Sequence, residues 1–273
     1  WTRNLAREYG AFDINWGHGS SPLVHGNALF LVCYHESASY LLAVDTRTGR
    51  TLWKVDRPKG VTSYSTPAIV PAPQGEELIV NSSVGIEAYE PATGKPLWHF
   101  TEANSFPIPV AMHHDGMIYL SRGYRSGPYA AIRPGGRGDI AKTHVVWHVP
   151  TGAPYISSLV HYDGLLYMAG DVGVISCIDA KTGQEVWRFY TIPSPDQIGG
   201  DTWPSPTDPD PIKRDAYLHG GATVWQAPAI DPDLHMIYFS TGNAGPDNDG
   251  SVRPGDNLFT ASIVALDYKT GQY

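Results

Sequence analysis

The histidines and the Gly-rich run are the residues whose types could bind a metal ion or a phosphate, but their spacing matches no known motif for either. Eleven histidines are present, but His113 and His114 would point to opposite faces of a strand. His144 and His148 would share a face, with no third ligand near them in the sequence. We therefore predict no zinc site. The Gly-rich run 133–139 lacks the Gly-Lys-Ser/Thr ending and the following helix of a phosphate-binding loop, so we interpret it as a turn.

One polar residue stands out by its place at the end of a strand. The segment IYFSTGN, residues 237–243, is an apolar strand that runs into small residues and stops on the amide of Asn243. The sequence continues Ala244-Gly245-Pro246. Asn and Gly tolerate left-handed backbone, and Pro ends strands. The residues alone favour a turn at Asn243, and leave open whether its amide also binds something.

The elements that would position these residues come from an internal repeat. Four segments share the pattern A-x-D-x-x-T-G-x-x-x-W: LAVDTRTGRTLW (42–53), EAYEPATGKPLW (87–98), SCIDAKTGQEVW (176–187) and VALDYKTGQY (264–273). Their spacing corresponds to a period of about 45 residues. A divergent copy with a longer turn, residues 130–147, fills the gap between the second and third.

Each copy predicts two strands joined by a tight turn, in which Gly supplies a positive φ. Two further apolar segments precede each copy, such as 65–69 and 106–110 as first strands. Four strands per period indicate a β-propeller blade. We predict an all-β protein with tryptophan-docking motifs and about five blades, part of an eight-bladed propeller. One domain would cover 1–273.

A Pro-rich insertion at 190–221 interrupts the blades. It could wall a substrate funnel, carry a calcium ion or be an ordered surface excursion.

Composition narrows the classes of partner. The net charge is −8 and no basic cluster occurs, which argues against nucleic acid. No apolar run approaches the roughly 20 residues of a membrane span, and the sequence starts at Trp1 with no leader pattern. Cys33 and Cys177 lie far apart in the sequence, so they indicate neither a redox pair nor a disulfide framework.

The repeat resembles the tryptophan-docking motif of the pyrroloquinoline quinone (PQQ) propellers, which include eight-bladed quinoprotein dehydrogenases and non-enzymatic relatives. Within 187–272, four ordered segments resemble the quinoprotein alcohol dehydrogenases: WRFYTIPSP, GGDTW (199–203), GGATVWQAPAIDPDLHMIYFSTGN (220–243) and RPGDNLFTASIVALD (253–267). Residues 1–186 look more like the non-catalytic members.

This resemblance implies specific roles. Asn243 would bind the metal ion, calcium or a lanthanide, that holds the quinone, and Trp225 would lie against the flat face of the quinone. The residue types suit these roles, because hard cations take neutral amide oxygens and a planar cofactor packs on a ring. The family's metal-binding Glu is missing from 167–174, where Asp171 is the only carboxylate that could replace it.

Two hypotheses about function follow. The first is a quinoprotein dehydrogenase that oxidises an alcohol with PQQ and passes electrons to an acceptor such as a cytochrome c, in the periplasm or outside the cell. Its catalytic Asp would lie in a later blade, so we assign no catalytic residue here, and the family's vicinal Cys pair is also absent. The second is a non-catalytic propeller that acts as a protein-binding scaffold.

Overall fold

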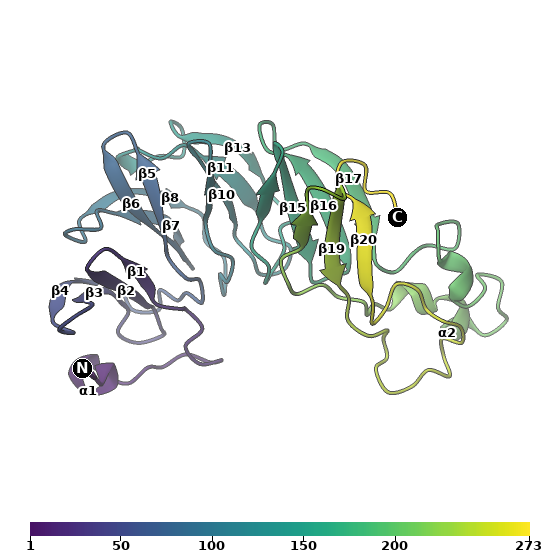
Figure 1. Ribbon diagram of the computed structural model, residues 1–273. Helices are drawn as coiled ribbons and strands as arrows, with labels where there is room; N and C mark the ends of the chain where they lie inside the picture. Colours follow the sequence, from purple (N-terminus) through teal and green to yellow (C-terminus); the bar gives the residue numbers. More distant parts are fainter. The chain divides into compact units, whose positions relative to one another are not determined.

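The computed structural model describes residues 1–273, which form two compact units, Trp1–Leu159 and Val160–Tyr273. Both consist mainly of antiparallel sheets with short helical turns (Figure 1). No helix has the length and apolar character needed to cross a membrane. The all-β prediction is confirmed, while a single domain over 1–273 and the number of blades remain predictions.

Unit 1 begins with helix α1 (Leu5–Tyr9) and contains three sheets. The first sheet has the order β1 (Leu23–His25), β2 (Ala28–Cys33), β3 (Tyr40–Asp45), β4 (Thr51–Asp56). The second has β5 (Ala68–Ala72), β6 (Gly75–Ser82), β7 (Gly85–Tyr89) and β8 (Pro96–Thr101). The third has β9 (Met112–His114), β10 (Met117–Ser121), β11 (Tyr129–Ile132) and β13 (Val145–Val149). The four-stranded antiparallel blade predicted from the repeat is thus present.

The Gly-rich run 133–139 departs from the prediction of a simple turn. Its last two residues form β12 (Gly138–Asp139), which pairs in parallel with β8. The divergent repeat has a longer connection than its neighbours, and this added length lets the loop reach the edge of the second sheet.

Unit 2 contains two sheets and the Pro-rich insertion. The first sheet has the order β14 (Val160–Tyr162), β15 (Leu165–Gly170), β16 (Val174–Asp179), β17 (Glu185–Tyr190), and the second has β18 (Ala229–Asp231), β19 (Met236–Ser240), β20 (Ile263–Asp267). The insertion carries the 3-10 turns η1 (Gly200–Thr202) and η2 (Ala216–Leu218) around α2 (Pro211–Arg214). In Figure 1, α2 lies away from the two sheets of this unit.

The acidic position of the repeat closes its own turn. In β16, Asp179 Oδ1 accepts hydrogen bonds from the backbone nitrogen and Oγ1 of Thr182, both at 2.8 Å. Asp45 and Asp267 make the same contacts with the Thr three residues later. These bonds lower the pKa of the Asp179 carboxyl, with the Thr182 hydroxyl as the main cause.

In two of the repeats, the tryptophan packs on the turn of the next repeat. Trp53 Nε1 donates to the carbonyl of Pro91 at 2.9 Å, and Trp187 Nε1 donates to the carbonyl of Tyr268 at 3.0 Å. Each ring lies on a glycine, since a Cβ on Gly94 or Gly271 would come within 2.6 Å of the ring. The docking role predicted for these tryptophans is confirmed.

A single hydrophobic core joins the two sheets of unit 2. It includes Tyr167 and Ile175 from the first sheet and Phe239 and Leu266 from the second. This core fixes the ends of β15 and β19 relative to each other, and the candidate site residues follow those strand ends.

Candidate cofactor and metal site

Trp225 and Asn243 lie on two backbone segments that run side by side. The nitrogen of Ala222 donates to the carbonyl of Asn243 at 2.7 Å, and the nitrogen of Gly242 donates to the carbonyl of Thr223 at 2.9 Å. These bonds continue the pairing of β18 with β19 beyond the strand ends. The two predicted residues are therefore carried by one hydrogen-bonded ribbon.

Glycine makes this close approach possible. Gly221 has φ +99°, and a Cβ there would lie 2.3 Å from the nitrogen of Gly245 and 2.7 Å from the carbonyl oxygen of Asn243. A side chain at this position would force the two segments apart. In the GGATVW segment, the second glycine, Gly221, is thus required by packing.

The Asn243 side chain is exposed and its orientation is fixed by a carboxylate. Asn243 Nδ2 donates to Asp247 Oδ1 at 2.6 Å. An ionised carboxylate only accepts hydrogen bonds, so the amide nitrogen must face Asp247 and the neutral Oδ1 faces away from it. An oxygen presented in this manner suits a hard cation. The turn expected at Asn243 is not found there: its carbonyl is paired with Ala222, and the chain turns only at Asp247 and Asn248. What Asn243 offers is an exposed amide oxygen.

Trp225 presents its ring to solvent. It is 58% exposed, while its neighbour Val224 is fully buried and anchors the segment. An exposed indole held by a buried neighbour can pack against a planar ligand.

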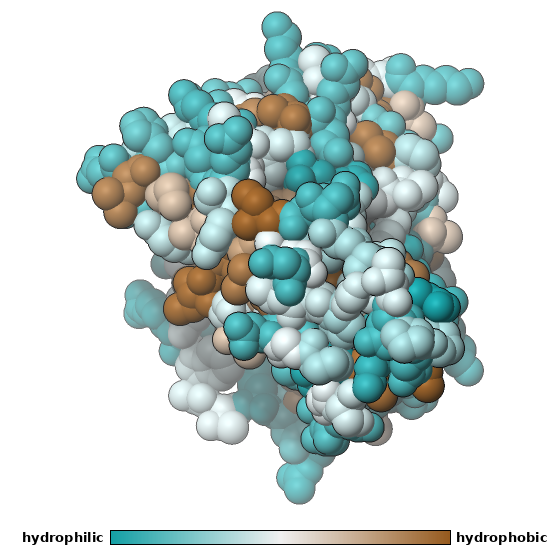
Figure 2. Space-filling view, turned by 90° about the vertical axis from the view of Figure 1, so that its right-hand side faces the viewer, coloured by the Kyte–Doolittle hydropathy of each residue, from teal (hydrophilic) through white to brown (hydrophobic).

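Other large apolar residues of unit 2 are also exposed, including Ile198, Leu218 and Ile263. On the face seen in Figure 2, brown apolar residues form small groups set among teal and white ones. Such scattered exposure is ordinary for a protein surface.

Asp171 lies in the turn between β15 and β16 and is half-buried. No group of three or more His, Cys, Asp or Glu side chains in the structure could hold a metal ion. The amide of Asn243 and the carboxylate of Asp171 fit calcium in the kind of oxygen they offer, but not in the number of ligands, which is six to eight. The remaining oxygens would have to come from a bound molecule and from water.

The Pro-rich insertion is tied to the loop that precedes β20. The backbone nitrogen of Asn257 donates to the carbonyl of Thr202 at 3.0 Å. The backbone nitrogen of Leu258 donates to the hydroxyl of Thr202 at 2.8 Å. Trp203 Nε1 donates to the carbonyl of Leu258 at 2.7 Å. The GGDTW and RPGDNLF segments are thus partners in one contact, which agrees with an ordered excursion.

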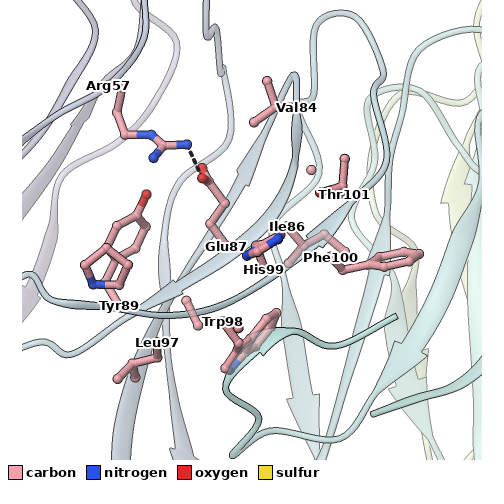
Figure 3. Close-up of a pocket in the computed structure, with 14 residues that line it drawn as sticks. Arg57, Val84, Ile86, Glu87, Tyr89, Leu97, Trp98, His99, Phe100 and Thr101 are labelled. Atoms are coloured by element: carbon pink, nitrogen blue, oxygen red, sulfur yellow. Dashed lines mark hydrogen bonds and ion pairs between the residues drawn. The ribbon is translucent and has the colours of Figure 1, made fainter. Parts of the chain in front are cut away.

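Unit 1 holds a cavity that none of the predicted site residues lines. It has a volume of about 570 Å³ beside β7 and β8 and contains an ion pair between Arg57 and Glu87 (Figure 3). Burial raises the pKa of the Glu87 carboxyl, and Arg57 acts in the opposite direction. Because Arg57 and Glu87 already neutralise each other, the cavity does not define a ligand charge.

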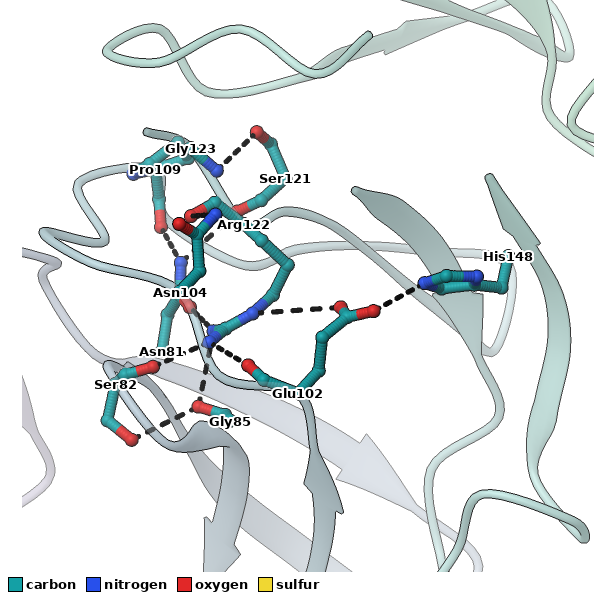
Figure 4. Close-up of polar contacts among 10 residues, drawn as sticks. All are labelled: Asn81, Ser82, Gly85, Glu102, Asn104, Pro109, Ser121, Arg122, Gly123 and His148. Atoms are coloured by element: carbon teal, nitrogen blue, oxygen red, sulfur yellow. Dashed lines mark hydrogen bonds and ion pairs between the residues drawn. The ribbon is translucent and has the colours of Figure 1, made fainter. Parts of the chain in front are cut away.

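Unit 1 also buries a complete guanidinium, which sequence reasoning missed. Arg122 is fully buried and donates to the side chain of Asn81 and to the carbonyls of Ser82, Gly85 and Glu102 (Figure 4). Burial lowers the pKa of Arg122 to about 10. The available signal was a charged residue directly after β10, which ends at Ser121. Arg122 also pairs with the Glu102 carboxylate, at 3.8 Å between Nε and Oε2. Because all its partners are groups of the same unit, we assign it to stability.

Two family models match the sequence. One, described as "Glucose/ethanol/alcohol dehydrogenase, beta-propeller domain", matches residues 139–273, and one described as "Outer membrane protein assembly factor BamB" matches residues 10–106. Both are PQQ-repeat models. The chain is a PQQ-type propeller protein.

The curated relatives of this PQQ-type propeller protein include quinoprotein alcohol dehydrogenases. It is 28% identical over 282 residues to quinohemoprotein alcohol dehydrogenase ADH-IIG of Pseudomonas putida, covering 96% of this chain and 32% of the relative. It is 29% identical over 288 residues to quinohemoprotein alcohol dehydrogenase of Comamonas testosteroni, covering 94% of this chain and 32% of the relative. The chain thus spans about a third of the length of these relatives.

Solved structures agree on the fold. The structure of ADHIIG from Pseudomonas putida aligns with a TM-score of 0.51 at 24% identity, over 96% of this chain and 34% of that one. BamB from Moraxella catarrhalis aligns with a TM-score of 0.51 at 13% identity, over 95% and 72%. Asp171, Trp225 and Asn243 all fall within the dehydrogenase-type match at 139–273 of this PQQ-type propeller protein.

Proposed function

We propose that this chain is the part of a quinoprotein dehydrogenase propeller that holds one face of the quinone and its metal ion, in an enzyme that oxidises an alcohol or a similar small substrate. The observation that carries the proposal is the Asn243 amide, whose nitrogen is held by Asp247 and whose oxygen is left for a cation. It lies in the region similar to alcohol dehydrogenases.

The chain's own residues would bind and orient the cofactor. Trp225 would support one face of the quinone, and Asn243 and Asp171 would supply oxygens to calcium or a lanthanide. When bound, PQQ supplies the two-electron acceptor and the metal ion a Lewis acid. The ring of Trp225 would also exclude water from the face that it covers.

The remaining functions of such an enzyme belong to other parts. We assign no general base in this chain. An electron acceptor such as a cytochrome c and a periplasmic or exported location are part of the same proposal, supported by the similarity to quinohemoprotein dehydrogenases.

The test is a titration of the full-length protein with calcium, with terbium as a luminescent substitute, and with PQQ. We expect Asn243→Ala to weaken metal binding about 10-fold or more, and Trp225→Ala to weaken PQQ binding with a smaller effect on the metal ion. Asn248→Ala, in the same exposed loop, is the matched control and should bind normally. Wild-type protein that binds neither ligand would exclude the proposal.

A second function is favoured by the other half of the chain. The match of residues 10–106 to the BamB model supports a propeller that never holds quinone and presents its loops to a protein partner. A stoichiometric quinone in the purified full-length protein would exclude this alternative.

A further inference from the structure

We infer that Thr191 is a positioning residue for the cofactor site, because its backbone nitrogen bonds the turn that carries Asp171 while its hydroxyl bonds the segment that carries Trp225. The inference rests on the proposed function, since it assigns Thr191 a role in holding the quinone and metal ligands. Thr191 itself is fully buried, so it would act through the backbone of other residues.

The contacts of Thr191 join three parts of unit 2. Directly after β17, its Oγ1 lies 3.0 Å from the carbonyl oxygen of Gly173 and 2.8 Å from that of Ala222. Its backbone nitrogen donates to Gly173 at 2.9 Å, and its own carbonyl accepts from the nitrogen of Phe259 at 3.3 Å. One threonine therefore bridges the β15–β16 turn, the segment before β18 and the loop before β20.

Two of these contacts lead directly to the candidate site residues. Gly173 stands two positions after Asp171, in the same turn. Ala222, three positions before Trp225, donates its nitrogen to the carbonyl of Asn243 at 2.7 Å. A continuous path of hydrogen bonds thus runs from the Asp171 turn through Thr191 to the Asn243 backbone.

The Thr191 hydroxyl is closely packed by its neighbours. Gly173 has φ +76°, and a Cβ on it would lie 2.5 Å from Thr191 Oγ1. Ala222 is fully buried, and the Thr191 hydroxyl is the donor to its carbonyl. Valine at position 191 would keep the shape of threonine but leave the Ala222 carbonyl buried without that donor. Relief of this defect requires the segment 220–224 to shift, and the shift would move Trp225 and Asn243.

The test compares Thr191→Val with Thr191→Ser, which keeps the hydroxyl, in the full-length protein. We expect Thr191→Val to raise the dissociation constants for terbium and PQQ about 10-fold or more, in the range found for outer-shell partners of metal ligands. Thr191→Ser should stay within about 2-fold of wild type. Ser121→Ala removes another buried hydroxyl that donates to a carbonyl, that of Pro154 at 2.8 Å, and should leave both constants unchanged.

A second readout needs no ligand. Amide hydrogen exchange of Ala222 reports the bond to Asn243, and we expect it to accelerate about 10-fold or more in Thr191→Val but not in Thr191→Ser. If wild type binds neither ligand while this exchange accelerates, the proposed function fails and the positioning of the segments stands. If exchange and affinities are the same in Thr191→Val and wild type, or if Thr191→Ser fails like Thr191→Val, the inference is overturned.

Discussion

Replacement of Gly221 by alanine tests whether the two site segments are as closely apposed as the structure describes. A Cβ at this position would lie 2.3 Å from the nitrogen of Gly245 and 2.7 Å from the carbonyl oxygen of Asn243. Both neighbours are backbone atoms, so no side-chain rotation relieves the clash. The neighbouring Gly220 has a similar φ, +88° against +99°, and a Cβ there meets nothing within 4 Å. Gly220→Ala is therefore a matched control.

The expected decreases in the free energy of unfolding follow from the geometry. Either substitution places alanine in left-handed backbone, which costs about 1–2 kcal/mol. Gly221→Ala should in addition separate the two segments and weaken the hydrogen bonds Ala222–Asn243 and Gly242–Thr223, at about 1 kcal/mol each, with about 1 kcal/mol or more for overpacking. We expect Gly221→Ala to lose roughly 3 kcal/mol more than Gly220→Ala.

Urea unfolding of both variants, followed by tryptophan fluorescence, measures the difference. The metal and quinone titrations should show the same order, with Gly221→Ala impaired and Gly220→Ala close to wild type. Equal unfolding free energies for the two variants would refute the close apposition of the segments, and with it the reasoning that places Trp225 and Asn243 on one ribbon.

Three further predictions concern the repeats and the buried arginine. Gly94→Ala should lose about 2 kcal/mol more than Gly116→Ala in urea unfolding, because a Cβ at Gly94 meets the Trp53 ring and Val55 whereas Gly116, with nearly the same φ, faces open space. In a Trp53→Ala background the difference should shrink, since only Val55 Cγ2, at 2.9 Å from that Cβ, would remain. The pKa of Asp179 is lowered in the folded state, so its stabilising contribution is present above the ordinary Asp pKa and is lost as pH falls through the lowered value. Asp179→Asn, which keeps the accepting oxygen, should show a smaller drop in urea midpoint on acidification, and an unchanged drop would contradict this account. Arg122→Ala should cost about 3–5 kcal/mol, because it leaves buried partners unpaired; a loss below about 1 kcal/mol would show that the network is dispensable.

The fold was predictable because the repeated motif reveals a period in the sequence, and each period contains the strands of one complete sheet. The position of the first strand of a blade was predicted less accurately. The segment 106–110 was predicted as a strand, but β9 spans Met112–His114. Pro107 and Pro109 carry no N–H for a ladder, so the pairing begins only after them.

The candidate site was predictable only in part. Asn243 and Trp225 could be named because they stand in recognisable segments. Thr191 also stands in one of these segments, WRFYTIPSP, but its role and that of Arg122 could not be predicted, since both depend on carbonyl groups supplied by segments distant in the sequence. Periodicity describes which face of a strand a residue occupies, whereas these contacts depend on how neighbouring sheets and loops meet.

The packing of tryptophan on glycine has a consequence for how such a chain can change in length. In two of the repeats the tryptophan, Trp53 or Trp187, acts as a plug that packs on the turn of the following repeat, and a glycine there, Gly94 or Gly271, is the socket that receives it. Gain or loss of one whole period keeps every plug matched to a socket, whereas gain or loss of a fraction of a period leaves one of each without its counterpart. We therefore expect this architecture to gain or lose whole repeats, since only such changes preserve the contacts between neighbouring repeats.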